Sequence, residues 1–188
     1  MKCFGSLVWS CYGSLVLMML GACAGSEPTA TVLPPLVSPA SLGSERVVSQ
    51  VVRGALGSRE ITFNCVVTIK DDAMTLVGMN SLGLRMFTIR YDGNAVQSEM
   101  APGLQGAFTP ERLLADMQLV FWPFASLEKP LREAGWELSE PSPGSRRLRH
   151  AGRLIAEAHY AGTDPWSARS WLVNFDHGYS LQIDTQAM

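Results

Sequence analysis

The sequence has few of the residues on which catalysis and metal binding most often depend. It contains four cysteines and three histidines in 188 residues. No pair of cysteines has Cys-x-x-Cys spacing, and the histidines form neither a His-x-His nor a His-Glu-x-x-His pattern. These absences exclude the common metal motifs. A glycine-rich phosphate loop and a Gly-x-Ser-x-Gly elbow are also missing, so we expect no enzyme activity, no catalytic residues, no cofactor and no metal.

The chain also lacks an excess of positive charge. Its formal net charge is −2, and charged residues make up only 17% of the sequence. Nucleic-acid binding needs clustered lysine or arginine, so a nucleic-acid partner is not expected. The one basic run, Arg146 to His150, is interpreted as the polar side of an edge strand. Hydrophobic residues reach 47%, which is enough for the core of one domain.

Long apolar stretches are confined to the N-terminus. Lys2 is followed by an uncharged, apolar or small run from Phe4 to Leu20, which ends in Leu20-Gly21-Ala22-Cys23. A positive start, an apolar stretch and small residues before the cut are the layout of a secretory signal peptide, expected over residues 1–22. The alternative is an uncleaved membrane anchor, because the run is marginally long enough to span a bilayer.

The segment Leu20-Gly21-Ala22-Cys23 resembles the lipobox of bacterial lipoproteins, in which the cysteine thiol receives diacylglycerol. The resemblance implies that Cys23 becomes the mature N-terminus and carries the lipid, including palmitate-type acyl chains. Ala24 stands where an aspartate would resemble an inner-membrane retention signal. The resemblance therefore favours anchoring at the periplasmic face of the outer membrane.

The remaining cysteines agree with this processing. Cleavage would remove Cys3 and Cys11, and lipidation would block Cys23, which leaves Cys65 without a partner. Cys65 lies in an apolar alternating run, and we interpret it as a buried structural thiol. Residues 23–44, which contain four prolines, are expected to form a flexible tether, so the folded domain is expected over residues 45–188.

Periodicity predicts mainly strands in this domain. Residues 44–56 have valines at helical spacing and are predicted to form a short helix. Apolar alternation predicts strands over 61–69, 74–79, 84–91 and 95–100. A helical insertion over 109–134 follows, opened by Thr109-Pro110-Glu111. Five further strands are predicted over 136–139, 145–150, 153–160, 168–175 and 178–184.

These elements define an α+β fold. A sheet of about nine antiparallel strands must curl to bury one face. The helical insertion is the obvious cover for that face. We therefore expect a curved, incomplete β-barrel with a short helical lid and an apolar space between them.

Three stretches carry a resemblance to known families. Residues 113–123 resemble the signature of an uncharacterised bacterial lipoprotein family associated with aryl polyene biosynthesis clusters, and the match covers about Arg59 to Ile183. Thr75 to Gly83 and Leu113 to Leu131 resemble the strand–turn and the helical lid of the LolA/LolB lipoprotein carriers. The chain departs from LolB at Ser81, where proline is usual, and it lacks a clear cavity-facing basic residue.

The resemblance implies an envelope lipoprotein that binds or relays a hydrophobic cargo: a lipid, a lipoprotein or a polyene-lipid. Leu82 is the candidate membrane or cargo contact. The candidate lining residues, which are equally interpretable as ordinary core, are Phe63, Phe87, Ile89, Leu113, Met117, Phe121, Trp122 and Trp171. The alternative hypothesis is a structural or adaptor lipoprotein that docks an envelope or biosynthetic protein through a sheet edge and has no ligand cavity.

Overall fold

A computed structural model describes residues 32–104 and 108–188 of the chain. The predicted signal peptide, Cys23 and the first part of the predicted tether lie outside these described residues. Within the described ranges, no helix has both the length and the apolar character needed to cross a bilayer.

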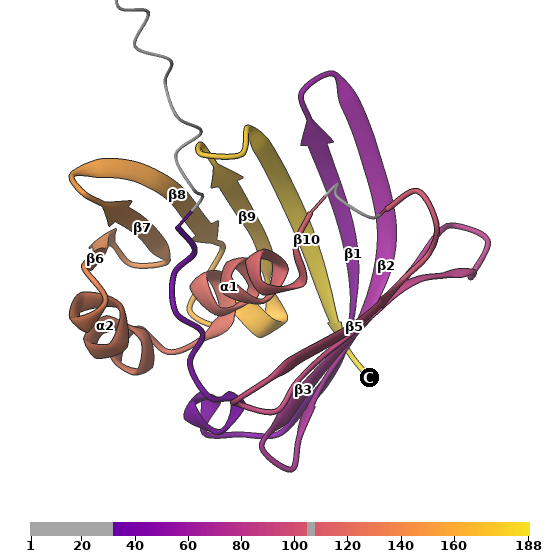
Figure 1. The fold of residues 1–188 in the computed structure, drawn as a ribbon, viewed down its shortest axis with the longest axis horizontal. Helices are drawn as coiled ribbons and strands as arrows, with labels where there is room; N and C mark the ends of the chain where they lie inside the picture. The colour runs from indigo at the N-terminus through magenta and orange to yellow at the C-terminus, as the bar shows by residue number, and fades with distance from the viewer. Residues whose placement is uncertain (1–31, 105–107) are drawn as a thin grey trace, which may run out of the picture. The chain divides into compact units, whose positions relative to one another are not determined.

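Ten antiparallel strands form a single sheet, which curves around helix α1 (Figure 1). Each half of the sequence contributes a meander, and the first strand pairs with the last to join the two. The strand order is β5-β4-β3-β2-β1-β10-β9-β8-β7-β6, so the sheet ends at β5 and β6 and is not closed. The strands are β1 (Arg46–Leu56), β2 (Arg59–Lys70), β3 (Ala73–Met79), β4 (Arg85–Tyr91), β5 (Val96–Met100), β6 (Trp136–Ser142), β7 (Ser145–His150), β8 (Arg153–Tyr160), β9 (Arg169–Asn174) and β10 (Tyr179–Ala187).

The helix predicted over residues 44–56 is wrong, because this segment is strand β1 in the middle of the sheet. Its valines are β-branched, and such side chains pack better on a pleated surface than on a helix. Val48, Gln50 and Val52 are buried, while Val47 is 47% exposed. This alternation has the period of a strand. The other predicted strands are present, so the expected sheet of about nine strands is confirmed as one of ten.

Helix α1 (Pro110–Phe121) lies against the concave face of the sheet, and helix α2 (Phe124–Glu133) packs beside the edge strand β6 (Figure 1). Thr109 caps α1 by accepting a hydrogen bond from the Arg112 backbone N–H at 3.3 Å. The helix ends at Phe121 because Trp122 precedes a proline and adopts extended backbone, with φ −78° and ψ 151°. The predicted helical insertion over 109–134 is confirmed.

The structure differs from the predicted tether at residues 32–44, which pack on the domain. Val37 is buried, and its backbone exchanges two hydrogen bonds with the buried Gln118 side chain, at 2.9 and 2.7 Å. The short 3₁₀ helix η1 (Pro39–Leu42) follows and buries Leu42. Burial of these apolar side chains stabilises the docked segment, and the prolines restrict its backbone without preventing contact.

Arg146 holds the C-terminal end of α1. It is 4% exposed, and its Nη1 donates to the backbone carbonyl oxygens of Leu119 at 2.8 Å and Trp122 at 2.7 Å. A cation at the last carbonyls of a helix is favourable. The interpretation of the basic run as the polar side of an edge strand is therefore wrong for Arg146. Strand β7 is second from the edge, and its arginines alternate between the core and the solvent.

Candidate functional site

An apolar cavity of about 40 Å³ lies between helix α1 and the concave face of the sheet. We call it the inner cavity. Side chains from both halves of the sheet meet α1 there, because β1 and β10 pair at the centre. Its lining residues are Gln50, Val52, Phe63, Cys65, Leu76, Phe87, Leu113, Asp116, Met117, Leu172, Leu181 and Ile183.

A second apolar hollow of about 60 Å³ lies next to the inner cavity, at the start of α1. We call it the mouth. It is lined by Ile61, Phe63, Phe108, Arg112, Leu113, Tyr179 and Leu181. Three of these residues, Phe63, Leu113 and Leu181, also line the inner cavity, so they form the wall between the two spaces. Each of the three is only half-buried.

Gly54 lies next to two residues that line the mouth. It faces the concave side of β1, opposite Ile61 and Leu181 in the register. A Cβ atom at this position would lie 2.7 Å from Leu181 Cδ2 and 3.0 Å from Ile61 Cγ1. A larger side chain would therefore push into the space between these two residues. The strand ends that surround the mouth are apolar without being fully packed, and Ile61 is 41% exposed.

Aromatic rings connect the mouth to the floor of the inner cavity. Phe87 makes edge-to-face contacts with Phe63 and Phe108, each with ring centroids 5.7 Å apart. The Phe87 ring lies over Gly78, where a Cβ atom would come within 2.2 Å of the ring. Gly78 therefore allows Phe87 to lie flat against β3, and this position of Phe87 shapes the floor.

A buried carboxyl group lies at the polar end of the inner cavity. Asp116 accepts a hydrogen bond from the Tyr179 hydroxyl, and Asn174 Nδ2 lies 3.5 Å from Asp116 Oδ1. Burial raises the pKa of Asp116 to about 6, although the donors Tyr179 and Asn174 and the charge of Arg112 oppose this rise. Burial and the neighbouring Asp116 also raise the pKa of Tyr179. Asp116 is therefore an acid that can change its charge near neutral pH.

Arg112 places a positive charge at the mouth. Its guanidinium carbon lies 5.6 Å from the centroid of the Tyr179 ring, which is a cation–π distance. The sequence-based statement that the chain lacks a cavity-facing basic residue is therefore wrong. Helical spacing alone does not show which side of the first turn of α1 faces the sheet.

The predicted lining residues fall into two groups. Phe63, Phe87, Leu113 and Met117 line the inner cavity. The others lie elsewhere: Ile89, Phe121 and Trp122 are fully packed core residues, and Trp171 is on the outer face of the sheet. Trp122 and Phe121 pack against Trp166, at ring-centroid distances of 6.4 and 4.5 Å. These positions correct the predicted lining role of these four residues.

Trp171 is excluded from the cavity by strand alternation. In β9, Ser170, Leu172 and Asn174 face the core, so Trp171 points outward, where it stacks on His159. An apolar alternation does not by itself show which set of residues is inside. Leu82, the candidate contact residue, is 81% exposed in the β3–β4 turn.

Sequence reasoning missed several residues of this site. Phe108, Arg112 and Asp116 carried no motif, whereas Tyr179 and Leu181 had a signal in the alternation of the last strand. Cys65 lines the inner cavity, and burial raises its thiol pKa to about 12. The thiol is therefore protonated and unreactive at neutral pH.

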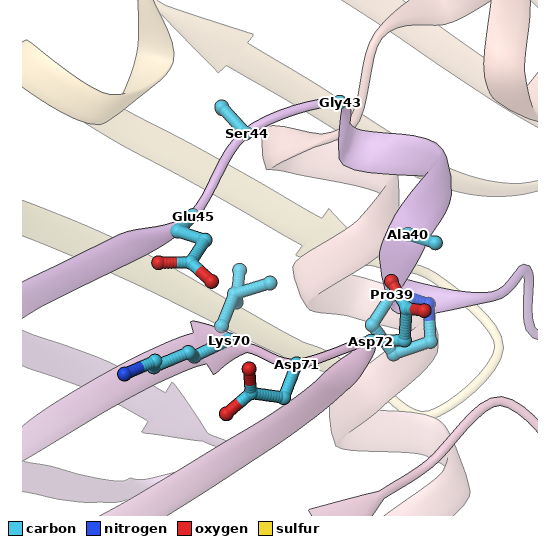
Figure 2. Close-up of a pocket in the computed structure, with 9 residues that line it drawn as sticks. Pro39, Ala40, Gly43, Ser44, Glu45, Lys70, Asp71 and Asp72 are labelled. Atoms are coloured by element: carbon cyan, nitrogen blue, oxygen red, sulfur yellow. The ribbon is translucent and has the colours of Figure 1, made fainter.

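A more voluminous hollow lies elsewhere and is open to solvent. Its volume is about 440 Å³. Figure 2 shows that η1 and the start of β1 form one side of this hollow and that the β2–β3 turn forms the other. Glu45, Lys70, Asp71 and Asp72 are among its lining residues. The part of the chain that the structure describes contains no group of three or more His, Cys, Asp or Glu residues placed to hold a metal. The apolar space under α1 is the stronger candidate site, because it is enclosed by apolar side chains from both halves of the sheet and from α1.

The fold and the site together define a class of protein: an open antiparallel half-barrel with a small apolar cavity beneath a covering helix. The chain belongs to the family described as a protein of unknown function (DUF3261), whose model matches residues 47–187. No curated protein matches the chain.

Among solved structures, the chain is similar to a LolA superfamily protein from Nitrosomonas europaea. The identity is 10%, the TM-score is 0.44, and the match covers 76% of this chain and 84% of that chain.

Proposed function

We propose that this protein is a lipid-anchored envelope protein that binds the apolar chain of a lipid or an acylated molecule beneath helix α1. The observation that supports this most directly is the apolar inner cavity with an apolar mouth beside it. Each methylene group that leaves water for such a space contributes about 0.8 kcal/mol. A chain can therefore be held without a specific polar contact.

The cavity has to enlarge to take a chain. Binding pockets for small ligands usually measure roughly 300–1,000 Å³, whereas the inner cavity and the mouth measure about 40 and 60 Å³. The wall between them consists of half-buried side chains from β2, α1 and β10. Rotamer changes of these side chains would join the two spaces, and such changes need no strand to break.

Helix α1 is suited to opening at one end. Arg146 and the buried Trp122 hold its C-terminal end. Its first turn borders the mouth through Arg112 and Leu113, which are only half-buried. We propose that a chain enters at this first turn while the C-terminal end of α1 stays in place.

The anchor and the location are parts of the same proposal. Lipid on Cys23 would hold the domain at the periplasmic face of the outer membrane, near acylated molecules. Two or more acyl chains on one residue give stable anchoring. The cargo classes that the proposal allows are a lipid, a lipoprotein or a polyene-lipid.

The test is the uptake of a chain by the full-length, processed protein. We expect acylated species in a lipid-extraction mass spectrum and saturable binding of a fluorescent long-chain fatty acid. Leu113→Trp fills the mouth and should weaken binding by at least about tenfold, which corresponds to roughly 1.4 kcal/mol. Val173→Trp places the same ring on the outer face of the sheet, where the native side chain is 36% exposed.

Val173→Trp should bind as the wild type does, and thermal unfolding checks that both variants fold. A clean mass spectrum together with no uptake would overturn the carrier function. That result would favour the adaptor function instead, for which the open sheet edges at β5 and β6 offer a surface.

A further inference from the structure

We infer that the ligand of this site is a single-chain amphiphile with an anionic head, which Arg112 holds at the mouth while the chain occupies the inner cavity. This inference rests on the proposed function. The ligand lies in one direction, with its head at the mouth and its chain pointing inward.

The placement of charge around the site supports this direction. Among the described residues that line the mouth, Arg112 is the one with a formal charge, and the other side chains are apolar or aromatic. Among those that line the inner cavity, Asp116 is the one carboxyl group. An anionic head is attracted to the mouth and repelled from the interior, so the ligand lies with its chain inward and its head outward.

The surroundings of Arg112 suit this role. The Tyr179 ring lies beneath the guanidinium group and orients it. Arg112 stands in the first turn of α1, where the helix dipole also favours an anion. The neighbouring Glu111 is exposed to solvent, outside the lining of the mouth. Arginine binds carboxylate, phosphate and sulfate groups through charge-assisted hydrogen bonds, so all three heads fit this chemistry.

Arg112 also faces titratable groups on the side away from the mouth. Arg112 also borders a small hollow lined by Asp116, Asp176 and His177. Burial and, after it, the positive charge of Arg112 lower the pKa of His177. The same charge of Arg112 opposes the rise in the pKa of Asp116. Asp176 forms an ion pair with Arg153, and the Tyr179 hydroxyl bonds to Asp116. Protonation of Asp116 therefore leaves the charge of Arg112 less compensated.

This arrangement makes anion binding depend on pH. Affinity for a head that stays ionised should rise as the pH falls through about 6, because Asp116 then loses its charge. Asp116→Asn should bind with little dependence on pH over the same range. A purely structural role of Arg112 would not produce this pattern.

The experiment compares probes that share one chain and differ in the head. Hexadecyl sulfate, hexadecanol and hexadecyltrimethylammonium are titrated against the full-length, processed protein, the two ionic probes below their micelle concentrations and hexadecanol below its solubility limit. We expect hexadecyl sulfate to bind at least about tenfold more tightly than hexadecanol, since a hydrogen bond to a charged group has this magnitude. The cationic probe should bind most weakly.

Arg112→Gln should remove the preference for sulfate by lowering the affinity for hexadecyl sulfate far more than the affinity for hexadecanol, and Arg112→Lys should keep part of the preference. Arg85→Gln is the matched control, because Arg85 is an exposed residue of β4 away from the mouth. Equal binding of the three probes would overturn the head assignment alone. Equal loss of all probes in Arg112→Gln would also overturn it, and no binding of any probe would overturn the proposed function together with this inference.

Discussion

At the scale of single residues, the fold brings the pKa of the Asp116 carboxyl group close to the neutral range. This carboxyl group lies in an apolar cavity, and its hydrogen bonds to Tyr179 and Asn174 are not enough to offset the loss of water. Its pKa rises from 3.8 to about 6. Between pH values of about 4 and 6, the folded state therefore keeps a proton on Asp116 that the unfolded state has already released.

This difference predicts how stability depends on pH. As the pH rises from about 4 to about 6, the folded protein still holds the proton on Asp116 while the unfolded chain does not. The stability that this proton contributes is lost over that window, by roughly 3 kcal/mol for a pKa difference of about two units. Asp116→Asn should remove this slope, because an amide does not titrate in this pH range. The variant should still fold, since its amide oxygen can accept the Tyr179 hydrogen bond.

Urea unfolding at several pH values between about 4 and 8 measures the effect. Asp72→Asn, in the exposed β2–β3 turn, is the control and should keep the slope of the wild type. An unchanged slope in Asp116→Asn would show that another group causes the pH dependence.

At the scale of elements, helix α1 depends on a strand that is distant in the sequence. Arg146 of β7 donates to carbonyl groups at the end of α1, and its guanidinium carbon also lies 5.6 Å from the centroid of the Tyr160 ring. The adjacent Arg147 points outward and pairs with Glu157 at 2.7 Å. Two neighbouring arginines of one basic run therefore have different roles, and strand alternation decides which role each one has.

The pair gives a matched test. Arg146→Met leaves buried carbonyl groups of α1 without their donor and should destabilise the fold by about 3 kcal/mol. Arg147→Met removes only a half-exposed ion pair and should cost under about 0.5 kcal/mol. Chemical denaturation of the two variants measures both values. Similar losses in the two variants would refute the anchoring role of Arg146.

Element boundaries were more predictable than element orientation. The start of α1 at Thr109 and Pro110 and its end before Pro123 follow from local chemistry, and both appear in the structure. The strand β1 was missed because valines at 47, 48, 51 and 52 also fit helical spacing. The segment forms a strand and not a helix because it pairs with β2 on one side and with β10 on the other.

At the scale of the whole molecule, the prediction to test is the lipid anchor. Cys23→Ser removes the thiol that the lipobox resemblance assigns to diacylglycerol. We expect this variant to lose the acyl mass and to leave the membrane fraction or remain as an unprocessed precursor. Membrane fractionation and intact mass spectrometry measure this outcome. An unchanged mass with unchanged fractionation would refute lipidation of Cys23.

The docked segment 32–44 also belongs to this scale. Its prolines indicate an irregular backbone, which is what the structure shows outside η1. They do not indicate that Val37 pairs with Gln118, a residue 81 positions away. Such a contact depends on where α1 lies, so no local pattern contains it.

The sequence by itself determined the local features of this protein: the strand-rich α+β character, the helix limits and the absence of common catalytic motifs. These follow from side-chain period, capping and proline chemistry, which act over a few residues. Only the tertiary structure decided which face of each element is inside. It placed Trp171 outside and Arg146 inside, and it brought Arg112 of α1 beside Tyr179 of β10. The site under α1 exists because strands from the two ends of the domain pair at the centre of the sheet, and that pairing has no local signal.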